Sequence, residues 1–353
     1  MDVARLKRGA YGAVLARRRL PFPKDAVVGL EDTAHVLLRF SRSLHEFRSQ
    51  VWSKEVAFAE EMTARGRSFA VTADPGEVFG KSVMWHHRTD LVKPRLWNYA
   101  KQMHQLIAGI EEQGNTAFTS SGEVLFWENK AHMHRRLDEI GAPTPRTLIL
   151  DGDPRAVADI DFEPLLVKQE HSSSSQGLWH FDRAADAREF VTRYAFRPTE
   201  SLIVQEIVAR ATKDLRLTMV GDRMIESASY WRIKSAEALA SEEWTTTATS
   251  NESTVVHGEI PEAAVAAAAR HLRALGLRTA GFDFMWAGDD VEGPPLVLEL
   301  SPLYEPNPPK PRRYDHWSYK QYKRNPFIAE GYFSQQHLVF RDIVGQVLDQ
   351  GMY

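Results

Sequence analysis

The sequence contains no cysteine among its 353 residues. It can therefore form no disulfide, use no cysteine nucleophile and build no thiolate metal site, which is in keeping with a reducing compartment. No run of about 18 apolar residues occurs, and Arg17, Arg18 and Arg19 interrupt the basic N-terminal stretch before the apolar segment of a signal peptide can form. We therefore expect a cytoplasmic protein with no membrane-spanning segment.

An excess of charge of one sign is also missing, because the formal net charge is only −3. This balance gives no bulk reason to expect a polyanionic partner. Hydrophobic residues make up 43% of the chain and charged residues 26%, which is typical of a folded globular protein and not of a disordered one. A chain of 353 residues is too long for one ordinary core, so we expect two or three packed subdomains.

The N-terminal third predicts mainly helices. Residues 53–66 begin at a serine and end at a glycine, as a capped helix does, and residues 97–114 have the amphipathic period of a helix. Residues 68–73 are a short strand candidate, and residues 115–118 are interpreted as a turn. The stretch 32–52 has a mixed period in which helix is favoured over strand.

The region from 142 to 301 predicts an α+β arrangement with antiparallel pairs instead of a regular βαβ series. Asn129 is placed to cap a helix that ends at Gly141. The apolar runs 163–169 and 200–208 predict buried strands with a helix between them. Two hairpins are expected, at 214–232 with its turn at Gly221–Asp222 and at 280–301, and the alanine-rich helix 261–277 lies between them.

Four consecutive serines, residues 172–175, follow the first of these strands. Because they lie between two strands, we interpret them as a hairpin tip and not as an interdomain linker. Backbone N–H groups of small residues can form a concave anion site, and serine hydroxyls add donors. Lys168 is the nearest charged side chain on the preceding strand, and Gly177 supplies conformational freedom where the loop turns back. Taken alone, the pattern is also that of a solvated hairpin loop.

Two acidic residues of the last hairpin, Asp283 and Glu299, are each flanked by apolar residues. A carboxylate buried without a partner is costly, so each should be paired or bound to a metal. Two facing carboxylates would repel each other unless a cation lies between them, and a hard ion such as Mg²⁺ suits such a site. The alternative is that either acid pairs with a nearby arginine such as Arg216.

The strand that ends at Gln205 and Glu206 continues through Ile207 and Val208. It offers backbone polar groups beside apolar side chains, which is what an adenine ring requires. Asp214, farther along the chain, could contact a ribose hydroxyl. The next hairpin carries two basic side chains available to a phosphoryl group, Arg216 and Arg232.

In order along the chain come N-K opening a helix, G-x-P-T-P-x-T, a strand ending in lysine, a small-residue loop, V-Q-E, D-L-R, F-D-F and L-E-L-S-P. This ordered set resembles the ATP-grasp superfamily, in the style of glutathione synthetase and the ribosomal-protein glutamate ligases, over residues 100–305. The resemblance implies an ATP-grasp fold, in which two α+β subdomains clasp ATP, preceded by an α/β domain. The implied boundaries are 1–122 for the N-terminal domain, 123–200 for subdomain A with a lid loop at 171–177, and 201–353 for subdomain B with a C-terminal wrap.

The resemblance also implies a role for each matching residue. The nucleotide-binding residues would be Lys130, Lys168, Ser173, Ser174, Ser175, Gly177, Gln205, Glu206, Ile207, Val208 and Asp214. The metal ligands would be Asp283, Glu299 and Ser301. The catalytic residues that steady the transferred phosphoryl group would be Arg216 and Arg232.

The implied activity is a ligase that uses ATP and Mg²⁺ to join a carboxylate to an amine through an acyl phosphate, with small molecules or peptides as substrates. One departure is Ser301, where most relatives carry an asparagine. A serine hydroxyl is shorter and a poorer metal ligand than an amide oxygen. The alternative is therefore a degenerate ATP-grasp protein that binds nucleotide without ligase turnover. Many relatives are dimers, so a homodimer is a candidate state.

Three remaining patterns carry less weight. Basic residues of the stretch 310–324 interleave with aromatic ones, which can bind single-stranded nucleic acid. Because this stretch follows the metal strand directly, we interpret it as a wall of the acceptor site and do not expect nucleic acid as a partner. The polar stretch 233–258 is interpreted as a substrate-side flap. His132 and His134 are two residues apart on a helix and point to different sides, so no metal pair is expected.

Overall fold

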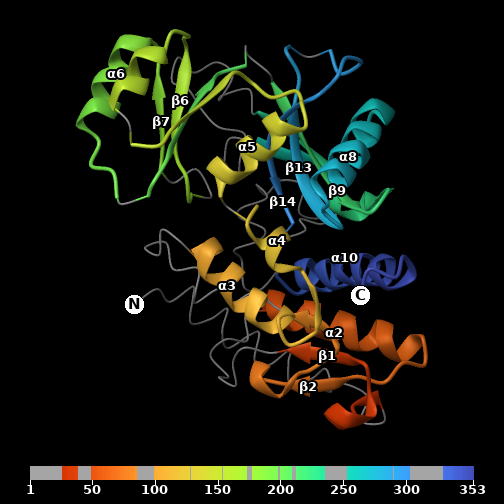
Figure 1. Ribbon diagram of the computed structural model, residues 1–353. Coiled ribbons are helices and arrows are strands. Elements are labelled where there is room, and N and C mark those ends of the chain that lie inside the picture. Colours follow the sequence, from red (N-terminus) through yellow and green to blue (C-terminus); the bar gives the residue numbers. More distant parts are fainter. Residues whose placement is uncertain are drawn as a thin grey trace. The chain divides into compact units, whose positions relative to one another are not determined.

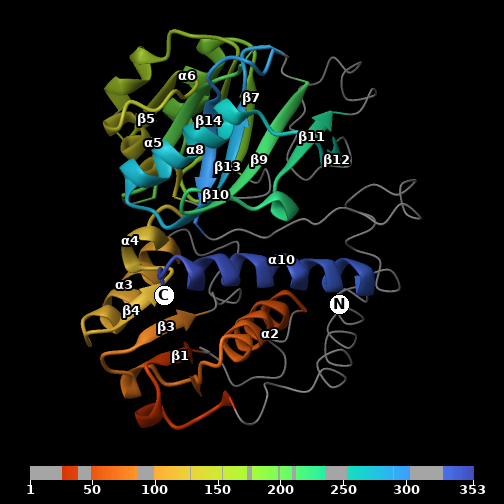
Figure 2. The same cartoon turned by 90° about the vertical axis from the view of Figure 1, so that its right-hand side faces the viewer.

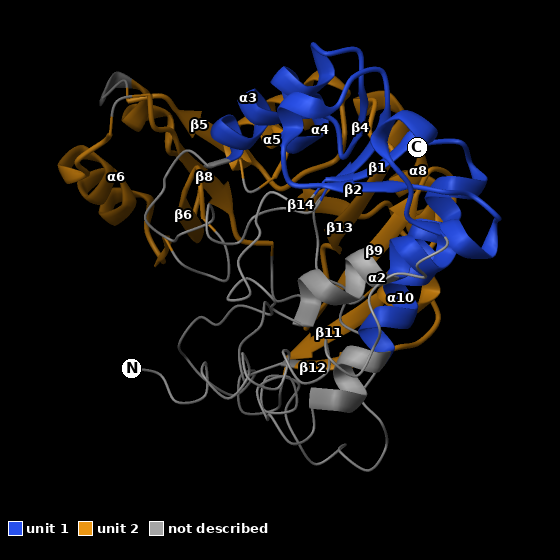
Figure 3. Ribbon diagram, turned by 90° about the horizontal axis from the view of Figure 1, so that it is seen from below, with its two compact units in different colours: residues 1–124, 305–353 blue, residues 125–304 orange. Residues whose placement is uncertain are grey.

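A computed structural model describes residues 26–38, 49–85, 99–127, 129–152, 154–172, 177–197, 199–208, 212–234, 253–288, 290–302 and 329–353. The chain divides into two compact units (Figure 3). Residues 1–124 and 305–353 form the first unit, and residues 125–304 form the second. The expected features at Arg17–Arg19, Ser173–Ser175 and 310–324 lie outside the described residues.

A four-stranded parallel sheet with the strand order β2-β1-β3-β4 forms the centre of the first unit. Its strands are β1 (His35–Leu38), β2 (Ala70–Thr72), β3 (Ser82–Trp85) and β4 (Thr116–Phe118). Its helices are α2 (Ser49–Ala64), α3 (Tyr99–Glu111), α4 (Ser121–Val124) and α10 (Ala329–Asp349), with short 3₁₀ turns η2 (Leu30–Asp32) and η4 (Pro75–Glu77) (Figures 1 and 2). The predicted helices at 53–66 and 97–114 and the predicted strand at 68–73 are confirmed as α2, α3 and β2.

Two predictions for this unit are wrong. Residues 35–38 form strand β1 where helix was favoured, and residues 116–118 form strand β4 where a turn was expected. Val36, Leu37 and Leu38 are at most 1% exposed, so side chains on both faces of β1 are buried, and the strand also lies between two other parallel strands. A strand buried on both faces appears in the sequence as a short continuous apolar run, which periodicity cannot distinguish from a buried helix segment.

The C-terminal helix belongs to the first unit. Helix α10 packs along α2, where Arg65 Nη2 lies 2.8 Å from Asp349 Oδ1 and Arg341 Nε lies 2.9 Å from Glu61 Oε1. The segment 201–353, expected as subdomain B with a C-terminal wrap, is therefore divided, since residues 329–353 lie with the N-terminal sheet. These contacts join residues more than 250 positions apart in the chain, so no local pattern announces them.

The smaller sheet of the second unit contains β5 (Thr147–Leu150), β6 (Leu165–Gln169), β7 (Leu178–Phe181) and β8 (Leu202–Glu206) in the order β5-β8-β6-β7, and every pair is antiparallel. Helix α6 (Ala184–Arg193) covers one face, after the 3₁₀ segment η5 (Pro154–Asp159). Apolar residues such as Val167 and Val204 pack there with Ala187 in one core. Because side chains alternate along a strand, Lys168 and Gln205 fall on the opposite face.

The larger, six-stranded sheet has the order β12-β11-β9-β13-β14, with β10 beside β9. Its strands are β9 (Lys213–Val220), β10 (Arg223–Met224), β11 (Tyr230–Lys234), β12 (Ser253–Val256), β13 (Thr279–Met285) and β14 (Leu296–Ser301), and η6 (Glu226–Ala228) precedes β11. Leu217, Phe282 and Phe284 pack against α8 (Glu262–Leu275) in one core (Figure 1). Alternation therefore leaves the charged residues of these strands on the opposite face.

Helix α5 (Lys130–Glu139) lies between the two sheets and contacts β8 of one and β14 of the other (Figure 1). Its expected cap is confirmed, since the Asn129 side chain accepts a hydrogen bond from the His132 N–H at 3.2 Å. Both predicted hairpins are confirmed, with the first turning after Val220, and residues 233–258 supply part of β11 and all of β12. Within the described chain, no helix is long and apolar enough to cross a membrane.

The last residue of the chain provides a test of the first unit. The Tyr353 hydroxyl accepts a hydrogen bond from the Met84 N–H at 3.2 Å and lies 2.9 Å and 3.0 Å from the carbonyl oxygens of Val36 and Ser82. It thereby links β1 to β3. We expect Tyr353→Phe to lower the free energy of local unfolding of these strands by about 1–3 kcal/mol, because buried polar groups lose their partner.

Amide hydrogen exchange followed by mass spectrometry measures this effect. The matched control is Tyr194→Phe, which removes a hydroxyl that is hydrogen-bonded to Gln169 and Glu200 in the second unit. Exchange in β1 and β3 should rise in the first variant and stay unchanged in the control. Equal exchange in both variants would show that the Tyr353 hydroxyl does not hold the strands together.

Candidate functional site

Four charged side chains form a continuous network on the polar face of the larger sheet. The register places Asp283 opposite Arg216 and places Arg232 opposite Asp214. Asp283 lies 2.5 Å and 2.9 Å from Arg216 and 3.0 Å from Arg232 Nη2. Arg232 Nε also donates to Asp214 Oδ1. The structure therefore contains the Asp283–Arg216 ion pair that the sequence analysis gave as the alternative to a metal site.

This network is almost removed from water, since Asp214 is 1% exposed, Asp283 7% and Arg232 8%. Burial acts to raise the pKa of Asp283, but Arg216 and Arg232 outweigh it, so the pKa of Asp283 is lowered. Burial raises the pKa of Asp214 to about 6, against the opposite effect of Arg232. A ribose hydroxyl at Asp214 would meet a buried carboxylate whose Oδ1 already accepts from Arg232.

Glu299 lies directly opposite Asp283 on the neighbouring strand β14. A β-bulge skips Leu298 in this pairing, so that Val297 enters the core while Glu299 turns to the polar face. Its side chain is 38% exposed, and its Oε1 lies 3.4 Å from Lys130 Nζ. Ser301, opposite Gly281, follows two residues later on the same face.

The donors on this face fit a hard divalent cation. Asp283 and Glu299 supply neighbouring carboxylates, Ser301 supplies a hydroxyl, and Mg²⁺ usually keeps waters and phosphate oxygens as its other ligands. Throughout the described part of the chain, no cluster of three or more histidine or carboxylate ligands forms. The protein would therefore provide a minority of the ligands of such an ion.

Lys130 joins the base of the serine loop to the acidic strand. It is the first residue of α5 and is 8% exposed. Its Nζ donates to the Ser172 carbonyl oxygen at 2.5 Å and lies 3.4 Å from Glu299. The structure therefore brings together two of the expected site residues and the first serine of the loop.

Lys168 is held by Gln205 on the neighbouring strand β8. Its Nζ donates to Gln205 Oε1 at 2.5 Å, and Gln205 Nε2 in turn donates to Thr147 Oγ1 at 3.0 Å. Burial and the neighbouring charge of Lys130 lower the pKa of Lys168 to about 8, although Glu299 acts in the opposite direction. Lys168 therefore shares one electrostatic environment with Lys130 and Glu299.

The segment expected to contact adenine lies at the end of β8. The N–H groups of Glu206 and Ile207 are engaged by the carbonyl oxygens of Arg146 and Pro164, at 2.9 Å and 3.0 Å. The Glu206 side chain is exposed. An adenine contact would therefore fall to the carbonyl oxygens of this segment or to Val208.

Comparison with solved structures finds proteins with a similar fold. The chain is similar to the D-cycloserine synthetase DcsG, with 17% identity and a TM-score of 0.51 over 88% of this chain and 99% of that one. It is also similar to a RimK domain protein ATP-grasp from Sphaerobacter thermophilus DSM 20745, with 13% identity and a TM-score of 0.49 over 88% of this chain and 99% of that one. This chain has the ATP-grasp fold. No protein-family model and no curated protein matches it.

A third similar structure is the ATP-grasp ligase PsnB complexed with precursor peptide PsnA2 and AMPPNP, with 16% identity and a TM-score of 0.47 over 86% of this chain and 98% of that one. At such identities the likeness concerns the fold, and function depends on the residues of the site. The expected fold class is confirmed, with antiparallel sheets in the ATP-grasp unit and a parallel sheet in the N-terminal unit.

Gly177 directly precedes β7 in the β6–β7 hairpin. The backbone of Gly177 has a left-handed conformation, with φ +62°. Its carbonyl oxygen accepts a hydrogen bond from the Gln169 N–H at 2.8 Å. A Cβ atom here would lie 2.2 Å from Gln169 Oε1. Gln169 Nε2 donates to the Tyr194 hydroxyl at 2.7 Å, so glycine is required both by conformation and by space.

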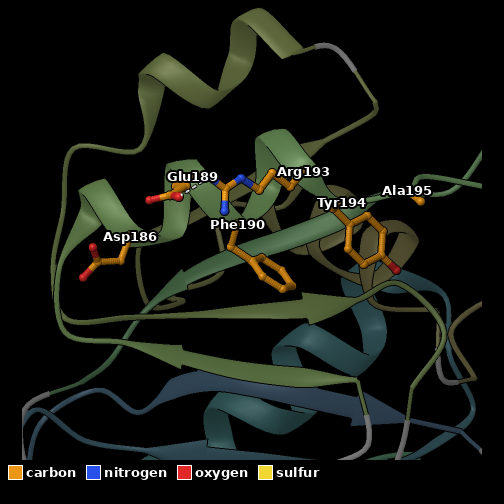
Figure 4. Close-up of a pocket in the computed structure, with 6 residues that line it drawn as sticks. All are labelled: Asp186, Glu189, Phe190, Arg193, Tyr194 and Ala195. Atoms are coloured by element: carbon orange, nitrogen blue, oxygen red, sulfur yellow. Dashed lines mark ion pairs between the residues drawn. The ribbon is translucent and has the colours of Figure 1, made fainter.

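A separate cavity of about 440 Å³ lies beside α6, where Phe190 points toward the strands (Figure 4). It is lined by Asp186, Glu189, Phe190, Arg193, Tyr194 and Ala195. Helix α6 covers the face of the smaller sheet that is opposite to Lys168. This cavity is therefore not part of the lysine and carboxylate cluster.

The sequence analysis missed the hydrogen-bonding role of Thr147 and the position of His134. Thr147 is opposite Gln205 in the β5–β8 register, which requires knowledge of the pairing. His134 is four residues after Lys130, a spacing that places both side chains on one side of a helix. The spacing from Lys130 could have indicated that His134 lies beside this lysine. The sequence analysis considered His134 only as a possible metal pair with His132.

Substituting Gly177 tests the packing of the β6–β7 hairpin around this residue. Gly177→Ala should lower the thermal unfolding midpoint, because a left-handed alanine costs about 1–2 kcal/mol and loss of the displaced Gln169–Tyr194 hydrogen bond costs about 1 kcal/mol more. The control is Gly152→Ala, at φ +76° with open space around the added Cβ. If both variants lose the same stability, the contact with Gln169 has no energetic role.

Proposed function

We propose that this chain is an ATP-dependent ligase that joins a carboxylate to an amine through an acyl phosphate and requires Mg²⁺. The observation that carries the proposal is the position of Lys130. Its ammonium group lies within 3.4 Å of both the carbonyl oxygen at the base of the lid loop and Glu299 on β14. A polyphosphate covered by the lid would therefore meet a lysine and a carboxylate strand in one place.

The charges of the cluster suit a polyphosphate. Four cationic side chains, Lys130, Lys168, Arg216 and Arg232, accompany the three carboxylates of Asp214, Asp283 and Glu299. An excess of positive charge in a largely buried site attracts an anion. Arginine and lysine donors with fixed positions also stabilise charge that develops on a transferred phosphoryl group.

Asp283, Glu299 and Ser301 would hold Mg²⁺. When bound, the ion would neutralise charge on the phosphate oxygens. Glu299 is the more accessible of the two acids, since it is 38% exposed and its contact with Lys130 is 3.4 Å long. Asp283 would share its oxygen atoms between the ion and its two guanidinium partners.

The proposed reaction has two steps. An oxygen of the substrate carboxylate attacks the γ-phosphorus, an oxygen–phosphorus bond forms, and the bond to the β-phosphate oxygen breaks to release ADP. The amine nitrogen then attacks the carbonyl carbon of the acyl phosphate, a carbon–nitrogen bond forms, and phosphate leaves as the nitrogen loses a proton. Arg216 and Arg232 would orient the phosphoryl group, and no protein nucleophile is required. Small molecules and peptides are the proposed substrates.

A second candidate is a degenerate ATP-grasp protein that binds nucleotide without ligase turnover. The observation that favours it is that both oxygen atoms of Asp283 are already contacted by guanidinium groups. Ser301 also favours this candidate, because its short hydroxyl is a poorer metal ligand than the amide oxygen of an asparagine. In this alternative the arginine pairs persist when nucleotide binds, and no cation displaces them.

Release of ADP from Mg-ATP, measured with pooled carboxylate and amine substrates, separates the two candidates. Glu299→Gln should lower kcat by about 100-fold, because it removes a charge next to the reacting phosphates. The matched control is Glu292→Gln, an exposed residue in the β13–β14 connection, which should not change kcat. Tight Mg-ATP binding without ADP release would support the degenerate protein, and failure to bind Mg-ATP would contradict both.

The pH dependence of nucleotide binding tests Lys168. Its pKa of about 8 in the nucleotide-free protein means that the ammonium form, which attracts phosphate, is lost as pH rises through 8. The affinity for Mg-ATP, measured by calorimetry from pH 7 to 9.5, should therefore fall above pH 8. Lys168→Arg, which stays charged, should remove this inflection. Identical profiles for the wild type and this variant would show that Lys168 does not contact the nucleotide.

A further inference from the structure

His134 is a buried and neutral side chain beside the two lysines of the proposed nucleotide site. It lies one helical turn after Lys130 on α5 and is 4% exposed. Burial, together with the positive charges of Lys168 and Lys130, lowers the pKa of His134 to about 3. The imidazole therefore carries a single proton, and one of its two nitrogens is a donor while the other is an acceptor.

Gln205 indicates which nitrogen carries the proton. Its Oε1 accepts from Lys168, so the amide is oriented with Nε2 toward Thr147 Oγ1 at 3.0 Å and toward His134 Nε2 at 3.5 Å. An amide nitrogen is only a donor, so the nitrogen of His134 that faces it presents its lone pair. The proton of His134 then lies on Nδ1.

The Nδ1 atom of His134 is buried and has no hydrogen-bond partner within the described part of the chain. A buried donor without an acceptor destabilises a fold, and an apolar residue of similar size would avoid that cost. His271 on α8 also has a buried nitrogen without a partner. The unpaired atom alone is therefore not decisive, and the difference lies in the surroundings, since only His134 of the two lies beside Lys130 and Lys168.

The neighbours of His134 define the acceptor that suits it. Lys130 and Lys168 both act on the imidazole through their positive charge, so a ligand atom that enters here should be anionic. A neutral donor adds a hydrogen bond to such an atom without adding repulsion to the two ammonium groups. We propose that the Nδ1–H group of His134 donates to a phosphate oxygen of the nucleotide bound beside Lys130 and Lys168. This inference rests on the proposed nucleotide site.

Three substitutions at His134, with calorimetric binding of Mg-ATP as the readout, test the proposal. The amide nitrogen of asparagine can replace Nδ1, whereas that of glutamine can replace Nε2. His134→Leu and His134→Gln should weaken Mg-ATP binding by about 10- to 100-fold, as expected for one hydrogen bond to a charged group. His134→Asn should bind within about threefold of the wild type. His271→Leu, the matched control, should leave the affinity unchanged.

The thermal stability of the nucleotide-free variant is a second readout. A purely structural role of His134 would lower it in His134→Leu, whereas a role in nucleotide binding would not. Without nucleotide, His134→Leu should unfold at no lower temperature than the wild type, because the substitution removes a buried donor that lacks an acceptor. A loss of nucleotide affinity at equal or greater thermal stability would support the proposal. A variant that loses stability and keeps its affinity would show that His134 is a packing residue.

The remaining outcomes separate this inference from the proposed function. If the wild type does not bind Mg-ATP, the nucleotide site itself is refuted. If the wild type binds but His134→Leu binds equally well, the site stands and the role of His134 is overturned. Binding of adenosine, which lacks phosphate, should be the same in the wild type and in His134→Leu. An equal loss of affinity for adenosine and ATP would overturn the assignment to phosphate.

Discussion

The carboxylate of Asp283, held between the guanidinium groups of Arg216 and Arg232, is the interaction on which the polar face of the larger sheet depends. Burying a charge is costly unless the charge has a partner. Removing one member of a buried ion pair therefore leaves the other charge buried without compensation, which destabilises the fold. Because Asp214 completes the network, all four residues constrain each other across β9, β11 and β13. The two arginines are therefore fixed in position before any ligand arrives, which is the condition for electrostatic preorganisation.

Helix α5 connects this face to the smaller sheet. Its first residue, Lys130, contacts Glu299 and the Ser172 carbonyl oxygen, and its second turn brings His134 near Gln205. Gln205 in turn holds Lys168. The polar residues of the two sheets thus depend on one short helix whose start is set by Asn129. Loss of this cap would affect the lysine positions together, since both are connected to the same helix.

Much of the second unit could be predicted from the sequence because its signals are local. Asn129 and Gly141 bound a helix, the turn after Val220 lies between two strands, and Gly177 closes a hairpin, all within a few residues of chain. The first unit was less predictable. Strand β1 was interpreted as helix, and the packing of α10 on α2 joins segments that are far apart in the chain, which no local pattern indicates.

The sequence by itself indicated the alternation of side chains along the strands of the second unit, the cap and the end of α5, and the need of Asp283 and Glu299 for a partner. Only the tertiary structure decided which charged side chains form ion pairs with each other. Arg232 donates to Asp214 across the β9–β11 pair, and the bulge at Leu298 turns Glu299 toward Asp283. The reason is physical: alternation and capping arise from bonds between near neighbours, whereas the partner of a buried charge is set by the register of strands that are distant in sequence.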